Sequence, residues 1–187
     1  MDITQTLYVT NRKDWRAWLR KHYRNENEIW LVYFKKDSGK PRIAYNDAVE
    51  EALCFGWIDS TVKKIDEEKY AQRYSPRKSI IRYSQSNKER LRKLLRQKKV
   101  IKSVRETLGG ISEEQYEVPR DILNAIQANQ QAWQNFQKFG DRYRRIRIAF
   151  IDGARKRPDE FKKRLAYFII MTEAGKQFGF GGIQRYY

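Results

Sequence analysis

The run from Glu28 to Phe34, EIWLVYF, constrains the fold more than any other part of this chain. Aromatic and β-branched residues of this kind favour a β-strand. Side chains of a strand alternate between two faces, so every second residue from Ile29 to Tyr33 lies on one face and the residues between them lie on the other. Both sets are apolar, so we expect a central strand in a sheet rather than an edge strand.

Helix and strand signals around this run predict an α+β fold, with a small mainly antiparallel sheet and two helices, followed by a helical C-terminal half. Asn11 and Asn46 are residues typical of helix N-caps, and Gly56 is typical of a helix end. The later segments show apolar residues at helical spacing, and Pro119 and Pro158 suit the first position of a helix. In the first half we expect a helix that starts at Asn11 and runs to about Tyr23, a helix over 47–55 capped by Asn46, and strands over 28–34, 57–65 and 69–75.

Composition and turn signals divide the chain into four parts. The predicted parts are an α+β N-terminal domain at 1–83, a basic helical segment and connector at 84–117, a helical C-terminal module at 118–176 and a tail rich in glycine and aromatic residues at 177–187.

Positive charge is concentrated in one stretch. The chain holds 40 Lys and Arg residues against 23 Asp and Glu residues, a net charge of +17. Between Lys69 and Arg105 there are fourteen cations and one acid, Glu89. Such a stretch attracts polyanions, so nucleic acid is a candidate partner through Lys69–Arg105. The alternative interpretation is a solvated helix face that keeps the protein soluble.

Several classes of protein are disfavoured by the sequence. The longest apolar run, Leu165–Met171, is far too short to span a membrane. The first residues lack the layout of a signal peptide, so we expect a cytoplasmic protein. One cysteine, Cys54, excludes an internal disulfide and a cysteine zinc cluster, and the only histidine is His22. We therefore expect neither a metal nor a cofactor.

Two stretches are similar to a known family. Ala44–Arg77, AYNDAVEEALCFGWIDSTVKKIDEEKYAQRYSPR, resembles the N-terminal signature of the YdeI or OmpD-associated family, also called bacteriocin-protection proteins. Val118–Glu173 resembles the helical C-terminal module of that family. Ser60 and Tyr83 stand where relatives usually have Gly and Trp. The resemblance implies a fold and a protective or stress-related role, and it implies no established reaction, so no catalytic residue is assigned.

The first candidate site is an anion site after the second hairpin strand. Alternation along the strand places Arg73, Ser75 and Arg77 on one side. Helix N-terminal amides together with two guanidinium groups suit a phosphate or carboxylate. The alternative is a set of exposed cations beside a capped helix. The candidate ligand-binding residues are Arg73, Arg77, Lys78, Tyr83, Ser84 and Asn87.

The second candidate site is a cleft that holds Trp57, Asp59 and Lys63. Alternation places Trp57 and Asp59 on one strand face, near Lys63, with Arg73 on the partner strand. The functional interpretation is a carboxylate and an indole beside paired cations. The alternative is a packed corner with a buried ion pair.

These observations favour a non-enzymatic stress or bacteriocin-protection-type protein that binds an anionic small molecule, such as phosphate, or an anionic partner. One alternative is non-specific nucleic-acid binding. The other is an enzyme that acts on a small anionic substrate in a cleft between Asp59 and Arg73.

Overall fold

The chain forms two compact units, and the computed structural model describes residues 2–78, 83–111 and 115–179. The first unit comprises Met1–Arg82 and Arg90–Ile111, and the second comprises Tyr83–Glu89 and Ser112–Tyr187. The basic segment expected at 84–117 is thus divided between the two units.

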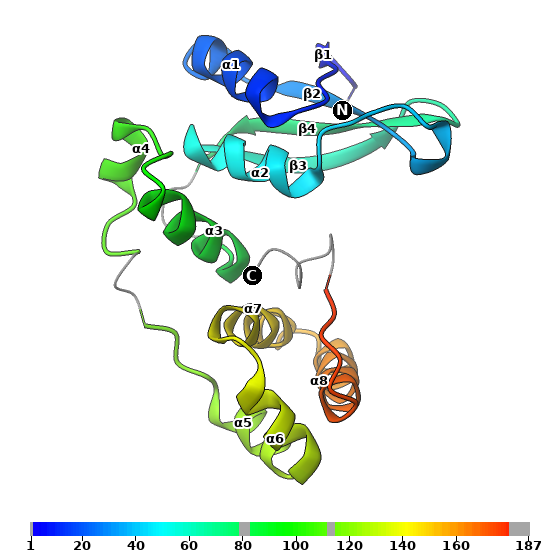
Figure 1. Ribbon diagram of the computed structural model, residues 1–187, viewed down its shortest axis with the longest axis vertical. Helices are drawn as coiled ribbons and strands as arrows, with labels where there is room; N and C mark the ends of the chain where they lie inside the picture. The colour runs from blue at the N-terminus through cyan, green and yellow to red at the C-terminus, as the bar shows by residue number, and fades with distance from the viewer. Residues whose placement is uncertain (1, 79–82, 112–114, 180–187) are drawn as a thin grey trace. The chain divides into compact units, whose positions relative to one another are not determined.

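The first unit is built on a four-stranded mixed sheet (Figure 1). The strand order is β1-β2-β4-β3; β1 is parallel to β2, and the other two pairs are antiparallel. The expected central position of β2 is therefore confirmed. The elements are β1 (Thr6–Leu7), α1 (Arg12–His22), β2 (Ile29–Phe34), η1 (Lys36–Ser38), α2 (Tyr45–Cys54), β3 (Trp57–Lys64), β4 (Lys69–Pro76), the end of α3 (Gln85–Arg96) and α4 (Lys102–Thr107).

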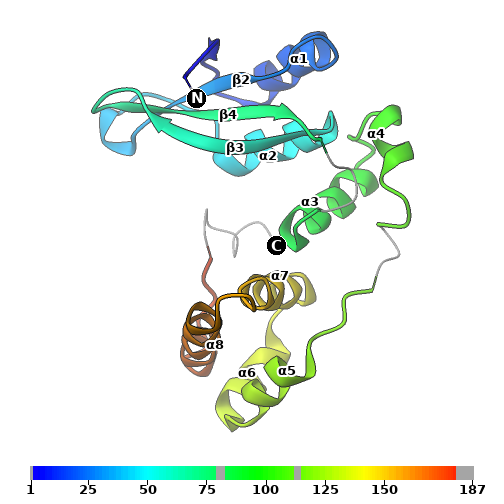
Figure 2. The same cartoon turned by 180° about the vertical axis from the view of Figure 1, so that it is seen from behind.

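The core of this unit lies between the sheet and the helices α1 and α2. Trp15 on α1 is fully buried; its indole contacts the ring of Tyr74 on β4 and donates a hydrogen bond to the carbonyl of Ala48 on α2. The hydroxyl of Tyr74 in turn lies 3.1 Å from the hydroxyl of Tyr33 on β2. Figure 2 shows the sheet from its other side, with β3 and β4 in front and α2 behind them. Trp15 therefore links both helices to the face of the sheet that carries Tyr74.

Two expected caps are placed differently by the structure. Helix α2 begins at Tyr45 after the N-cap Ala44. The expected cap, Asn46, is inside the helix, only 3% exposed, where its side-chain oxygen accepts a hydrogen bond from Arg90 at 2.7 Å. Pro119 is the N-cap of α5 rather than its first residue. In both cases packing and backbone geometry decide the position, and the local cap preference of the sequence does not.

The second unit is helical. Its helices are α5 (Arg120–Gln127), α6 (Gln130–Lys138), α7 (Asp141–Asp152) and α8 (Pro158–Glu173), preceded by the first residues of α3. Apolar residues from these helices form the core, among them Ile122, Phe136 and Phe168. Glu89, the one acid of the basic stretch, is 1% exposed and accepts hydrogen bonds from Arg145 at 2.7 and 3.1 Å. This carboxylate is therefore a structural ion-pair partner.

None of the described helices is long and apolar enough to cross a membrane. Within the same residues, no three side chains of the His, Cys, Asp or Glu type gather in a way that could hold a metal ion.

Candidate anion-binding pocket

Three arginines spaced by four residues gather at the end of α1. Arg16, Arg20 and Arg24 lie on one side because residues four apart on a helix are neighbours, and Tyr23 continues the helical backbone with φ −58° and ψ −21°. They border a pocket of about 520 Å³, a volume in the range of small-molecule sites. The residues that line it are Arg16, Arg20, Lys21, Tyr23, Arg24, Asn25, Phe55 and Ile101.

Arg16 is the fixed wall of this pocket. Its Nη1 donates to Glu51 at 2.7 Å and its Nη2 donates to the carbonyl of Lys99 at 2.8 Å. Its guanidinium carbon lies 5.2 Å from the centre of the Phe55 ring. Burial alone would lower the pKa of Arg16, but hydrogen bonds to Glu51 and Cys54 outweigh burial and raise it. Arg16 is thus a charged and preoriented group.

The remaining cations of the pocket are not neutralised by carboxylates. Arg20 and Lys21 are exposed and have no hydrogen-bond or ion-pair partner within the described part of the chain. The Nε of Arg24 donates to the hydroxyl of Tyr23 at 2.7 Å, which orients the guanidinium without cancelling its charge. No acidic side chain lines the pocket. Like charges brought together without acids create a positive potential that favours an anion.

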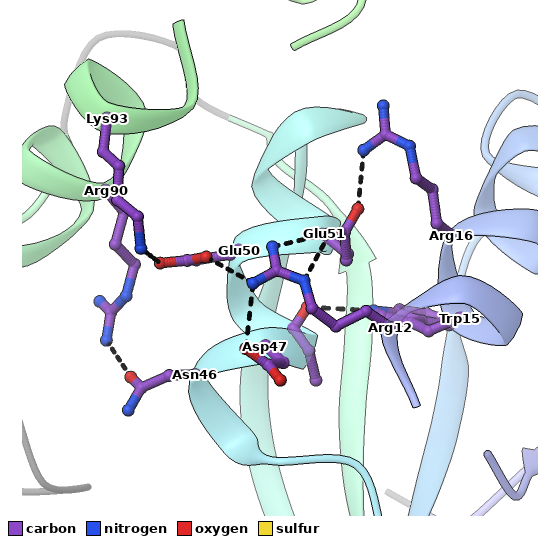
Figure 3. Close-up of polar contacts among 10 residues, drawn as sticks. Arg12, Trp15, Arg16, Asn46, Asp47, Glu50, Glu51, Arg90 and Lys93 are labelled. Atoms are coloured by element: carbon purple, nitrogen blue, oxygen red, sulfur yellow. Dashed lines mark hydrogen bonds and ion pairs between the residues drawn. The ribbon is translucent and has the colours of Figure 1, made fainter. Parts of the chain in front are cut away.

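In contrast to the remaining cations of the pocket, those of a neighbouring network on α2 are paired with carboxylates (Figure 3). Three carboxylates of α2 are paired with three cations from α1 and α3, and two of the carboxylates have side chains only 2–3% exposed. Burial alone would lower the pKa of Arg12, but its hydrogen bonds and charge interactions with the network outweigh burial and raise it. The paired groups are Asp47, Glu50 and Glu51 with Arg12, Arg16 and Lys93.

This network also uses part of the basic stretch. Lys93 is bound to Glu50 at 2.9 Å, Arg90 to Asn46 and Arg92 to the carbonyl of Ile111 at 2.8 Å. These three cations support the fold of the first unit, and they are less available to an external polyanion than their number suggests.

In the first candidate site, the structure brings Arg73 and Ser75 together. Arg73 Nη1 donates to Ser75 Oγ at 3.3 Å, so the two share a face of β4 as expected. However, Arg73 Nε is bound to Glu28 Oε2 at 2.6 Å, so its charge is already paired. The Arg77 backbone amide donates to the carbonyl of Gly56 at 3.0 Å, and Lys78 is exposed.

The other residues of this candidate site, Tyr83, Ser84 and Asn87, belong to the second unit. Ser84 Oγ accepts a hydrogen bond from the backbone amide of Asn87 at 3.4 Å. Ser84 therefore caps the start of α3, which is the local role that its position predicts.

The second candidate site is not assembled as expected. Asp59 pairs with Tyr74 in the sheet, whereas Lys63 pairs with Ala71, and a β-bulge lies between Asp59 and Val62. The extra residue changes the alternation, so Asp59 and Lys63 point to opposite faces. Arg73, next to Tyr74 on β4, also faces away from Asp59. The expectation of one cleft containing Asp59, Lys63 and Arg73 is therefore wrong.

The indole and the carboxylate of that site have structural partners instead. Trp57 is 1% exposed, and its Nε1 donates to the carbonyl of Tyr23 at 3.1 Å. Asp59 Oδ2 accepts hydrogen bonds from the Tyr45 hydroxyl and from Gln72 Nε2, both at 2.8 Å. Lys63 Nζ lies 3.7 Å from Asp2 Oδ1.

Sequence reasoning missed the basic pocket because it concentrated on the densest charge. The available signal was the four-residue spacing of Arg16, Arg20 and Arg24, together with the basic Lys21 and the aromatic Tyr23 between them. Phe55 and Ile101 come from distant parts of the chain, so their approach to these arginines could not be predicted from local pattern.

Comparison with known protein families gives two consecutive matches along the chain. A domain of unknown function, DUF8412, matches residues 7–107, and the family described as bacteriocin-protection, YdeI or OmpD-associated matches residues 115–175. The motif at Ala44–Arg77 falls inside the first match, so the YdeI match covers less than the resemblance implied. Comparison with curated proteins and with solved structures gives no match. The chain therefore belongs to the DUF8412 family, whose model covers more than half of it, and its residues 115–175 are similar to the bacteriocin-protection, YdeI or OmpD-associated family.

Proposed function

We propose that this protein binds a small anion with two or more phosphate groups in the basic pocket at the end of α1. The observation that carries the proposal is the convergence of Arg16, Arg20, Lys21 and Arg24 on one hollow with no acidic lining residue. Arginine forks bind phosphate oxygens in pairs, and lysine adds a mobile point charge. Three cations of the pocket, Arg20, Lys21 and Arg24, have no carboxylate partner among the described residues, so a ligand with several phosphates can offer an anionic oxygen to each of them.

Binding without chemistry suits the composition of the pocket. The lining residues include no carboxylate, imidazole or thiol that could act as a general base or nucleophile. Tyr23 and Phe55 offer aromatic rings, and Asn25 offers an amide. The protein would thus sequester or sense its ligand, in a protective role of the kind named by the description of the family that residues 115–175 match.

The test is calorimetric titration of the protein with pyrophosphate at matched ionic strength. Charge-assisted hydrogen bonds contribute about 1.5–3 kcal/mol each, so Arg20→Ala and Arg24→Ala should each weaken binding about tenfold or more. Lys13→Ala is the matched control, because Lys13 is an exposed cation of the same helix outside the pocket.

Equal losses for all three variants would show that net charge, not the pocket, governs binding. Retention of full affinity by Arg20→Ala and Arg24→Ala, with loss in Lys78→Ala, would move the site to the end of β4 and overturn the proposal.

A further inference from the structure

Arg147 on α7 is a buried cation that has no ionic partner. It is 7% exposed, and within the described residues it makes no hydrogen bond or ion pair; its Nε is fully buried without a partner. Its guanidinium carbon lies 4.1 Å from the centre of the Phe178 ring and 4.9 Å from that of Phe150. The charge therefore lies over the faces of two aromatic rings.

A second cation contacts the same aromatic ring. Arg164 lies 3.8 Å from the centre of the same Phe150 ring, and its own charge is paired with Glu160 at 2.6 Å. Burial lowers the pKa of Arg147; the charge of Arg164 lowers it further, and Tyr143 opposes that effect. Buried charges in proteins are normally paired, because desolvating one without a partner is costly. Arg147 is thus an unusual group to keep in a folded module.

Exposed apolar side chains adjoin this arginine. Phe150 is 45% exposed, Tyr167 is 51% exposed and Ile170, one turn further along α8, is 59% exposed. Tyr167 also packs edge to face on Phe178, with ring centres 4.9 Å apart. The Arg147 patch, as we name it, consists of Arg147, Phe150, Arg164, Tyr167, Ile170 and Phe178. Exposed apolar side chains that gather in one place, as Phe150, Tyr167 and Ile170 do around Arg147 and Phe178, are typical of interaction sites.

We propose that the Arg147 patch is a docking surface for an acidic segment of a partner protein. A carboxylate of the partner pairs with Arg147, and an adjacent apolar side chain covers Phe150 and Tyr167. Charge complementarity selects an acidic occupant, since Arg147 belongs to this patch and has no ionic partner among the described residues. Arginine and aromatic residues are also the groups that most often dominate binding energy at interfaces. This proposal is independent of the pocket in the first unit.

The probe is a display library of random 12-residue peptides, selected on the full chain. Selected peptides should carry Asp or Glu next to an aromatic or aliphatic residue. In fluorescence anisotropy, Arg147→Met and Tyr167→Ser should each weaken their binding at least tenfold, as should replacement of the peptide acid by its amide. Arg147→Lys should give an intermediate loss, because lysine lacks the planar fork. Arg120→Met, which removes an exposed charge of the same module outside the patch, should change little.

Failure to enrich any peptide, a consensus without acids, or equal binding by Arg147→Met would overturn the proposal. If Arg147→Met does not fold, the exposed positions Tyr167→Ser and Ile170→Ser decide the outcome. Peptide binding that appears only after deletion of residues 180–187 would assign the patch to the chain's own end. A dimer in sedimentation that Tyr167→Ser dissociates would assign it to a second copy. Either result would overturn the partner protein as occupant.

Discussion

Arg16 lies 2.7 Å from the carboxylate of Glu51, and through this contact one side chain belongs both to the buried network of α2 and to the basic pocket. The Glu51 side chain is 3% exposed, so the pair is anchored in the core. Preorganisation of this kind lowers the entropy lost when a ligand binds. The fold therefore prepares one wall of the pocket, while Arg20, Lys21 and Arg24 remain able to adapt.

The ion pairs of α2 should matter far more to stability than surface pairs. Glu50 is 2% exposed and lies 2.9 Å from both Arg12 and Lys93. Glu50→Gln leaves two partly buried cations without this anionic partner, which should lower the free energy of unfolding by about 2–3 kcal/mol. Glu68→Gln is the control, because its pair with Lys40 is exposed and should contribute under about 0.5 kcal/mol. Urea unfolding of both variants measures the difference, and equal midpoints would refute the structural role of Glu50.

Cys54 should be inert in the folded protein. It is fully buried, and burial together with the charge of Glu51 raises its pKa to about 11, against a partial opposing effect of Arg16. A thiol-specific disulfide reagent at pH 8 should therefore react slowly with native protein and quickly after unfolding in urea. Fast labelling of the native protein would contradict this assignment.

The same pKa predicts a loss of stability in alkali. Because the folded-state pKa of Cys54 is above the value of about 8.5 for a free thiol, its contribution is complete below pH ~8.5 and is lost as the pH rises toward 11. The wild-type free energy of unfolding should fall faster with pH than that of Cys54→Ala in this window, by up to about 1.4 kcal/mol per pH unit. Parallel pH profiles would mean that the thiol is not desolvated.

Gly56 should not tolerate a side chain. Its φ is +75°, and an added Cβ would lie 3.1 Å from Val104 Cγ2. Gly56→Ala should thus cost about 1–2 kcal/mol from the left-handed conformation alone. Gly140→Ala is the matched control, since its φ is −61° and its Cβ position is open. Thermal unfolding should separate the two variants, and a stable Gly56→Ala protein would contradict the assigned turn.

Much of the fold could be predicted from short-range pattern. The two-sided apolar run of β2 predicted a central strand, and the helix end at Gly56 followed from the conformational freedom of glycine. Strand β1 escaped prediction because two residues, Thr6 and Leu7, carry no periodicity. The bulge after Asp59 was equally invisible, because register depends on the partner strand and not on the sequence of β3 alone.

The sites were less predictable for a related reason. Charge density along the chain pointed to Lys69–Arg105, but folding pairs Arg73, Arg90 and Lys93 with groups more than forty residues away in sequence. Which cations keep their charge uncancelled is a property of tertiary packing. Local sequence can supply the spacing of candidate arginines, and only the fold shows which of them face an acid.

The most direct test of the basic pocket is a titration of the ¹⁵N-labelled protein with pyrophosphate, followed through backbone amide resonances. Binding in the pocket should produce saturable shifts concentrated at residues 16–25, Phe55 and Ile101, with one dissociation constant for all of them. The Arg20→Ala/Arg24→Ala double variant should abolish these shifts. Saturable shifts at residues 73–78 or 84–87 instead, or only weak non-saturating shifts spread over the whole chain, would contradict the assignment of the pocket.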